Sequence, residues 1–148
     1  MSQRVVIDAC VFAKLYIQEP DREQAIALLK TLVDKKIMII VPQLFFYEII
    51  SVAKYGNIEV SYVLNVLQTY QKNNLQLLEP DLNMLKTAIA ITDSGHPKSG
   101  YPSFYDAIYH AMALCLDCMF ITADKRYYEK TKQLGKIALL ENWEKIIV

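Results

Sequence analysis

The chain has 148 residues, of which 53% are hydrophobic and 22% are charged, and its 16 basic and 16 acidic side chains leave no formal net charge. This balance excludes a disordered protein, and no apolar run approaches the ~20 residues of a membrane span. We expect one soluble domain over residues 1–148, in which any contact with nucleic acid must be local. The N-terminus lacks a secretory signal, so we expect a cytoplasmic location and no membrane partner.

Strand-like and helix-like segments alternate along the chain. In chain order, the expected elements are a strand at 5–8, helices at 11–18 and 20–34, a strand at 37–41, a helix around Glu48, a helix at 59–72, a strand at 75–78, helices at 81–92 and 103–116, a strand at 118–122, a helix at 125–133 and a strand at 137–140. The strands are short apolar runs, which is typical of parallel strands covered on both faces. The sequence therefore predicts an α/β fold with a parallel sheet of about five strands between helices.

Four carboxylates fall where such a sheet would gather them. Asp8 and Asp124 follow the first and fourth predicted strands, and the carboxyl ends of parallel strands form the ligand crevice of an open α/β sheet. Asp106 lies at the start of the helix before the fourth strand, and Glu48 lies within the helix after the second strand. We expect all four side chains to point into one mouth.

Some of these carboxylates also have a possible structural role. Ser103 and Asp106 match a helix capping box, and Asp124 could be the N-cap of the helix that follows it. Asp8 closes an apolar strand without an obvious local role. Glu48 lies in the most apolar helical stretch, and its predicted helix neighbours form a largely inward face. An ionised carboxylate there should be protonated, paired or bound to a metal.

Four inward carboxylates would repel one another, and divalent cations would relieve this repulsion. Oxygen ligands without a matching set of histidines or cysteines favour Mg²⁺ or Mn²⁺ over zinc. These ions suit phosphate chemistry. One ion can lower the pKa of a bound water while a second, ~3.5–4 Å away, stabilises the leaving oxygen.

Four short motifs, in their order and spacing, resemble the PIN-domain ribonucleases and, among them, the VapC-like toxins of type II toxin–antitoxin systems. The motifs are Val6-Ile7-Asp8-Ala9, Val41-Pro42 followed by Tyr47-Glu48-Ile49, Ser103-Phe104-Tyr105-Asp106-Ala107, and Ile121-Thr122-Ala123-Asp124-Lys125. The resemblance covers nearly the whole chain. It implies a three-layer α/β/α fold in which Asp8, Glu48, Asp106 and Asp124 bind Mg²⁺ or Mn²⁺ and cut RNA.

The resemblance also implies supporting residues and partners. Thr122 and Ser103 would orient carboxylates or water around the metal, although strand-end and helix-cap hydroxyls also occur for structural reasons. The implied partners are an RNA substrate, a second copy of the chain in a homodimer, and an antitoxin whose tail enters the acidic groove. A basic antitoxin side chain, such as arginine, would neutralise the carboxylates and displace metal.

Cys10 and the two histidines bear on this metal site. Many family members carry a small hydroxyl or amide residue at the position of Cys10, and a thiol is a poorer hydrogen-bond partner for Asp8, which puts metal affinity in question. His110 lies four residues after Asp106, a spacing that could form a metal pair, but no third nitrogen or sulfur ligand accompanies it. We interpret His110 and His96 as structural or surface residues.

The C-terminal third could supply a local basic rim. Candidates are Lys125, Arg126, Lys130, Lys132 and Lys136, with Lys14 and Lys98 as further ones. Taken one by one, most are more simply solvated side chains. Residues 93–102 form the one loop rich in Gly, Pro and Ser, and long loops in compact domains are often functional.

Other functions fit less well. A haloacid-dehalogenase-type enzyme needs a second Asp two residues after the first, where this chain has Cys10, and a receiver domain needs an Asp after the third strand. The main alternative is a PIN-fold binding module that keeps the acidic pocket but associates with RNA or a protein and has little or no catalytic activity.

Overall fold

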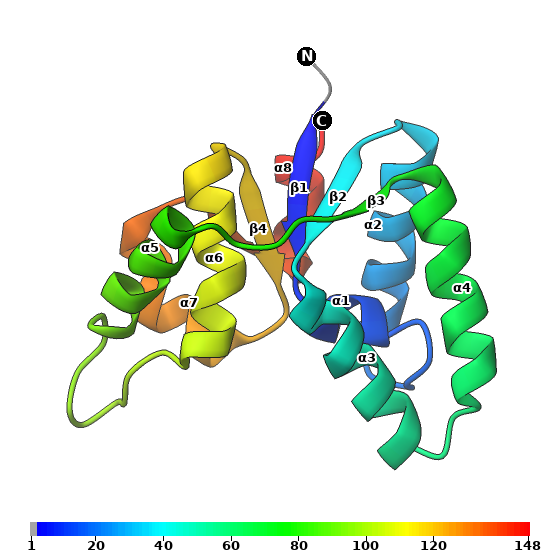
Figure 1. The fold of residues 1–148 in the computed structure, drawn as a ribbon, viewed down its shortest axis with the longest axis horizontal. Coiled ribbons are helices and arrows are strands. Elements are labelled where there is room, and N and C mark those ends of the chain that lie inside the picture. Colours follow the sequence, from blue (N-terminus) through cyan, green and yellow to red (C-terminus); the bar gives the residue numbers. More distant parts are fainter. Residues whose placement is uncertain (1–2) are drawn as a thin grey trace.

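The structure, a computed structural model, describes residues 3–148 (Figure 1). Its elements are β1 (Arg4–Ile7), α1 (Ala9–Ala13), α2 (Arg22–Asp34), β2 (Met38–Val41), α3 (Gln43–Tyr55), α4 (Val60–Asn73), β3 (Leu75–Leu77), α5 (Leu82–Thr92), α6 (Phe104–Leu116), β4 (Met119–Thr122), α7 (Lys125–Thr131), η1 (Lys132–Leu134), β5 (Ile137–Leu139), η2 (Leu140–Asn142) and α8 (Trp143–Ile146). Within residues 3–148, no helix is both long and apolar enough to cross a membrane.

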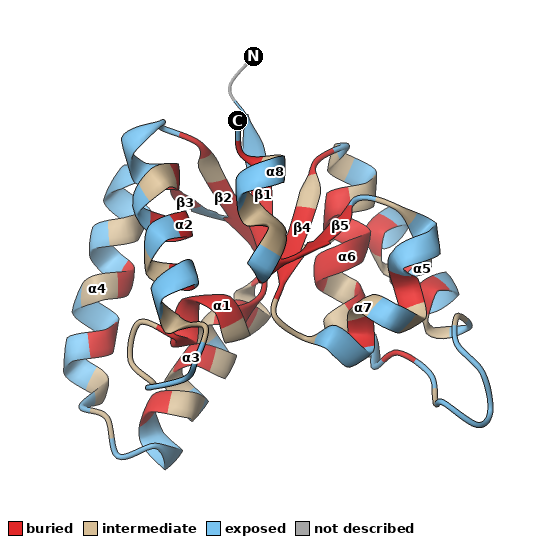
Figure 2. Cartoon of the chain, turned by 180° about the vertical axis from the view of Figure 1, so that it is seen from behind, coloured by how far each residue is buried: buried red, intermediate tan, exposed pale blue. Residues whose placement is uncertain are grey.

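The five strands form one parallel sheet in the order β3-β2-β1-β4-β5. The chain builds outward from β1 to β3 and then crosses back to place β4 on the other side of β1. Helices α5 and α6 lie on one face of the sheet, and α2 and α8 lie on the other (Figures 1 and 2). The predicted three-layer α/β/α fold is therefore confirmed. The strand order reverses at β1, and such a switch point opens a crevice at the carboxyl ends of the strands.

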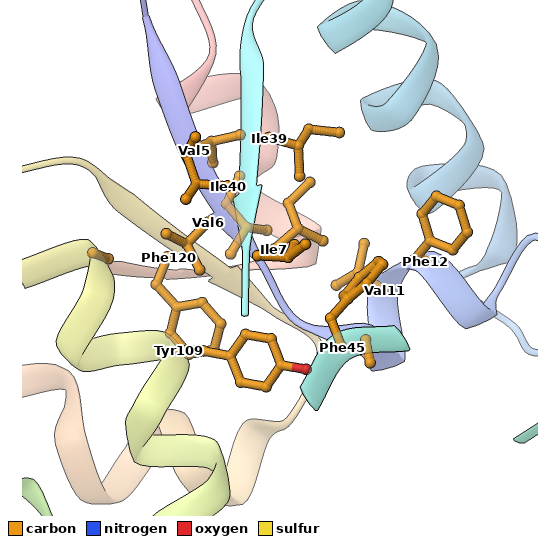
Figure 3. Close-up of a cluster of buried hydrophobic side chains, with 14 of the residues drawn as sticks. Val5, Val6, Ile7, Val11, Phe12, Ile39, Ile40, Phe45, Tyr109 and Phe120 are labelled. Carbon is orange, nitrogen blue, oxygen red and sulfur yellow. The ribbon is translucent and has the colours of Figure 1, made fainter. Parts of the chain in front are cut away.

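The core is continuous from the sheet into the helices at this edge. The strands are largely buried, apart from the edge strand β3, while the outer helix faces are exposed (Figure 2). On α1, Phe12 packs edge-on against Phe45 of α3, with ring centroids 5.4 Å apart. Both rings are buried, as Figure 3 illustrates. This contact fixes the start of α3 beside α1, at the end of β1 where the carboxylates gather.

Two helices differ from the prediction near this edge. Helix α1 begins directly after β1 and ends at Ala13, instead of covering 11–18. The reason is that the Asp8 side chain accepts a hydrogen bond from the Cys10 amide and caps the helix there. The predicted helix at 125–133 ends at Thr131 and continues as a single 3₁₀ turn.

Candidate active site

Four carboxylates line one cleft at the carboxyl edge of the sheet, as the sequence predicts. We call it the acidic cleft; its volume is about 380 Å³. Asp8 follows β1, Glu48 lies on α3, Asp106 lies in the first turn of α6, and Asp124 immediately precedes α7. Segments that are far apart in the sequence therefore meet at the switch point of the sheet (Figure 1).

Asp8 is buried at the base of the acidic cleft, with 6% of its surface exposed. Thr122 donates a hydrogen bond of 2.9 Å from Oγ1 to Asp8 Oδ2, and the Cys10 amide donates one of 3.1 Å to Oδ1. Thr122 Oγ1 also accepts a hydrogen bond of 3.0 Å from the Asp124 amide. Thr122 thus links two of the carboxylate residues, and the view that Asp8 has no local structural role is wrong, because it caps α1.

Glu48 is held by a residue that the sequence analysis did not single out. Tyr109 Oη donates a hydrogen bond of 2.6 Å to Glu48 Oε1. The Tyr109 ring is fully buried and stacks on Phe120, and its hydroxyl points toward α3 (Figure 3). Ser51 and Tyr55 are two of the predicted helix neighbours of Glu48, and both are exposed. The prediction of a largely inward face around Glu48 is therefore wrong in part. The sequence feature that could have identified Tyr109 is its position three residues after Asp106 on the same predicted helix.

Asp124 and Ser103 are N-caps as well as residues of the site region. The Asp124 side chain accepts a hydrogen bond of 3.0 Å from the Tyr127 amide and caps α7. Ser103 Oγ accepts one of 3.1 Å from the Asp106 amide and caps α6. Both caps set where their helices begin, and so they position Asp106 and Asp124 at the cleft.

Burial and mutual repulsion raise the pKa of three of the four carboxyl groups. For Asp8, burial is the largest cause and repulsion from Glu48 adds to it. For Glu48, burial and repulsion from Asp106 outweigh the hydrogen bond from Tyr109. Burial and repulsion from Asp8 and Asp124 raise the pKa of Asp106 to about 6. Protons or cations must therefore compensate this cluster near neutral pH.

Lys14 is a buried cation on the wall of the acidic cleft, and its charge is already neutralised. Its Nζ lies 3.0 Å from Glu19 Oε2 and 2.8 Å from Asp21 Oδ1. Arg22 donates hydrogen bonds to the backbone oxygens of Lys14 and Leu15 and so holds the same loop. For Lys14, the interpretation as a solvated surface lysine is wrong.

The donor set fits a hard divalent cation, although the ligands are not arranged closely around one point. All four side chains offer carboxylate oxygens, which Mg²⁺ and Mn²⁺ prefer. Within residues 3–148, none of the four forms an ion pair with a basic side chain. In the same range, no three Asp, Glu, His or Cys side chains are grouped closely enough to hold a metal ion. Binding a cation would therefore require the carboxylate side chains to move together.

The histidines lie outside this donor set. His110 is fully buried, with Nδ1 2.9 Å from the Tyr127 hydroxyl and Nε2 2.8 Å from the Gly135 carbonyl oxygen. Because the carbonyl can only accept, Nε2 carries the hydrogen and Nδ1 accepts from Tyr127. Burial lowers the pKa of His110, which favours the neutral ring. His96 is exposed and accepts a hydrogen bond from the Lys98 amide, so both histidines have the structural or surface roles expected for them.

A larger pocket, of about 600 Å³, lies at the opposite edge of the sheet and is lined in part by Arg4, Asp117 and Lys136. Lys136 Nζ lies 2.9 Å from Asp117 Oδ1, so the acidic group there is already paired. This position also removes Lys136 from the predicted basic rim of the carboxylate mouth. The acidic cleft is the better candidate for chemistry despite its smaller volume.

The fold and the cleft together define the class of the protein: a parallel α/β domain with a carboxylate site at the switch point of its sheet. The family model of the PIN domain matches residues 5–133. The chain therefore belongs to the PIN domain family, as its sequence motifs predict. PIN domains are in general nucleases.

Solved structures share this fold at low sequence identity. PAE2754 from Pyrobaculum aerophilum is 18% identical over 99% of this chain and 98% of its own, with a TM-score of 0.64. A toxin–antitoxin complex from Klebsiella pneumoniae is 14% identical over 92% and 97%, with a TM-score of 0.62. VapBC2 from Rickettsia felis, bound to a promoter DNA fragment, is 11% identical over 93% and 97%, with a TM-score of 0.65. A comparison with curated proteins finds no match to the sequence.

Proposed function

We propose that the protein is an endoribonuclease that depends on Mg²⁺ or Mn²⁺ and hydrolyses phosphodiester bonds in RNA. The observation that carries this proposal is the convergence of Asp8, Glu48, Asp106 and Asp124 on one cleft from four separate segments. Membership in a family composed generally of nucleases supports it. The raised pKa values of three of these carboxyl groups support a cation as their partner.

Asp8, Glu48, Asp106 and Asp124 would hold the cation through carboxylate oxygens. A divalent cation, when bound, makes water more acidic and offsets negative charge on a phosphate. The rest of the chain keeps the carboxylates in place: the Thr122 hydroxyl restrains Asp8 from within the sheet. The caps at the starts of α6 and α7 restrain the other two aspartates.

The protein would act as the toxin of a toxin–antitoxin pair. Support comes from the structural neighbours, since one is a toxin–antitoxin complex from Klebsiella pneumoniae and another is VapBC2 from Rickettsia felis. A basic antitoxin side chain would fit the acidic cleft, whose four carboxylates are not paired with cations within residues 3–148. Homodimer formation is part of the same proposal, and the exposed Leu82 and Ile89 on α5 offer apolar surface for it.

The test is cleavage of a mixed pool of structured and single-stranded RNA with Mg²⁺, with Mn²⁺ or with EDTA. Asp8→Asn and Glu48→Gln keep the size of each side chain and remove its charge. Asp93→Asn, at the exposed end of α5, is the matched control. We expect cleavage that EDTA abolishes, that falls at least about 100-fold in both cleft variants, and that Asp93→Asn leaves unchanged. Cleavage that survives in both cleft variants would contradict the proposal.

One observation keeps the binding-module alternative open. Within residues 3–148, the carboxylates are not grouped closely enough to hold a metal ion without rearrangement. A binding module would retain RNA or protein in the acidic cleft without cutting. Wild-type protein that binds RNA but cuts none at any Mg²⁺ or Mn²⁺ concentration would favour this second function.

A further inference from the structure

A third pocket, of about 340 Å³, lies next to the acidic cleft. Its lining consists of Ser99 from the loop before α6 and Lys125, Arg126, Glu129 and Lys130 from α7. We call it the basic pocket. The two sites adjoin, since Asp124 lines the acidic cleft and the next residue, Lys125, lines the basic pocket.

The positive charges of the basic pocket have few close ion-pair partners among the residues that the structure describes. Within residues 3–148, no carboxylate lies within 4.0 Å of the charged groups of Arg126 or Lys130. The single acidic residue of the pocket, Glu129, is paired with Lys132 at 2.8 Å. Lys125 Nζ lies 4.0 Å from Glu141 Oε2, at the outer limit for an ion pair. Of the basic rim predicted from the sequence, three side chains therefore gather here.

The loop rich in Gly, Pro and Ser forms the other wall of this pocket. His96 and Gly100 exchange two backbone hydrogen bonds, of 3.3 and 2.7 Å, which close the loop into a turn. Gly100 has a positive φ of 89°, and a Cβ there would lie 3.4 Å from Lys130 Nζ. The loop backbone thus lies against Lys130 and brings Ser99 to the edge of the pocket.

We infer that the basic pocket binds one nucleotide of a single-stranded RNA, beside the phosphodiester bond that the acidic cleft receives. This inference rests on the proposed function and adds a substrate-binding subsite to it. Arg126 and Lys130 contact the phosphate, and the aliphatic stems of the lysine and arginine side chains contact the ribose and base. A cluster of carboxylates repels a polyanion, so cations next to it are needed to hold the strand.

A single strand fits this arrangement better than a duplex. The pocket lies between a loop and a helix, and a nucleotide that enters it must leave its stacked neighbours. Unpaired nucleotides do this readily, whereas bases in an A-form duplex stay stacked and paired.

The test measures RNA binding and cleavage separately. The double variant Arg126→Gln/Lys130→Gln removes both charges and keeps most of each aliphatic stem. Lys72→Gln/Lys86→Gln removes two exposed charges from α4 and α5 and is the matched control. Binding of a fluorescent single-stranded RNA is followed by anisotropy in EDTA, where no metal-dependent cleavage occurs, over a range of salt concentrations. Thermal unfolding confirms that each variant is folded.

We expect Kd to rise about tenfold in the pocket variant. The slope of log Kd against log salt should fall by about 0.7 for each lost phosphate contact, and the control should match wild type. With metal present, KM should rise while kcat changes little. The variant Arg126→Lys/Lys130→Arg exchanges the two side chains and keeps both positive charges. It should bind the RNA with the wild-type Kd.

Equal Kd and equal salt slopes in the pocket and control variants would overturn the inference. Displacement of RNA by poly-glutamate as readily as by unlabelled RNA would also overturn it, because the pocket would then bind acidic chains in general. A wild type that binds RNA through this pocket but never cuts would contradict only the proposed nuclease. A pocket variant that binds and cuts RNA as wild type does would contradict only this subsite.

Discussion

Tyr109 donates a hydrogen bond of 2.6 Å to Glu48, although 61 residues separate the two in the sequence. The bond joins α6 to α3 at the acidic cleft. Since Asp106 also lies on α6, Tyr109 sets the position of Glu48 relative to Asp106. The stacked contact of Tyr109 with Phe120, at a centroid distance of 5.9 Å, ties this arrangement to β4.

Tyr109→Phe should weaken the site without unfolding the protein. In the wild type, the hydrogen bond from Tyr109 lowers the pKa of Glu48, which burial raises. Without this bond, the pKa of Glu48 should rise further, and the acid limb of the pH profile of cleavage should move to higher pH. We expect the free energy of unfolding to fall by about 1 kcal/mol. Tyr105→Phe, on the exposed side of α6, is the control. An unchanged acid limb in Tyr109→Phe would contradict this role.

Asp106 should make the metal-free protein less stable as pH rises from about 4 to about 6. Its pKa is raised from 3.8 to about 6, so the folded state holds more protons than the unfolded state in this window. The free energy of unfolding therefore falls with rising pH. Asp106→Asn removes this effect and should stabilise the protein at neutral pH by about 1 kcal/mol, since solvent screens this half-buried group.

Urea unfolding in EDTA at several pH values measures this difference. The lowered pKa of His110 acts in the opposite direction, because the unfolded state then takes up the proton more readily as pH falls. His110 is present in both proteins, so its contribution cancels in the comparison. If Asp106→Asn followed the wild-type pH curve, Asp106 would not be a source of the pH dependence.

Lys14→Met should destabilise the protein by about 2 kcal/mol. Methionine fills the volume of the buried stem but leaves Glu19 and Asp21 without their partner, and both are exposed enough to regain some hydration. Lys30→Met breaks the exposed pair with Asp34 and should cost less than about 0.5 kcal/mol. Chemical denaturation compares the two. Adding Glu19→Gln and Asp21→Asn to Lys14→Met should recover part of the lost free energy of unfolding. If Lys14→Met and Lys30→Met had equal effects, a buried ion-pair role of Lys14 would be excluded.

His110→Leu separates a structural role from a metal-binding one. The substitution leaves the Tyr127 hydroxyl and the Gly135 carbonyl without their partner, which should cost about 2–3 kcal/mol of stability. Affinity for Mn²⁺, measured by calorimetry, should stay at the wild-type level. His96→Leu, at an exposed loop position, should change neither quantity. Loss of Mn²⁺ affinity without loss of stability would make His110 a metal ligand instead.

Local sequence patterns predicted the order of strands and helices along the chain and the convergence of the carboxylates. Asp8 and Asp124 were found because apolar runs and turn residues mark the ends of parallel strands, and those ends share one edge. The same reasoning failed for the start of α1. Whether Asp8 ends a strand or also caps a helix depends on backbone angles that a short apolar segment does not specify.

The sequence by itself determined the parallel α/β fold, the family and the four carboxylates of the acidic cleft, because periodicity, turn residues and short motifs act over a few neighbouring positions. Only the tertiary structure decided that Tyr109 holds Glu48 and that Lys14 is buried in an ion-paired loop. Within residues 3–148, it also left Arg126 and Lys130 beside the cleft without a carboxylate partner. These features depend on which distant segments pack together, and side-chain burial and charge pairing follow from that packing rather than from local pattern.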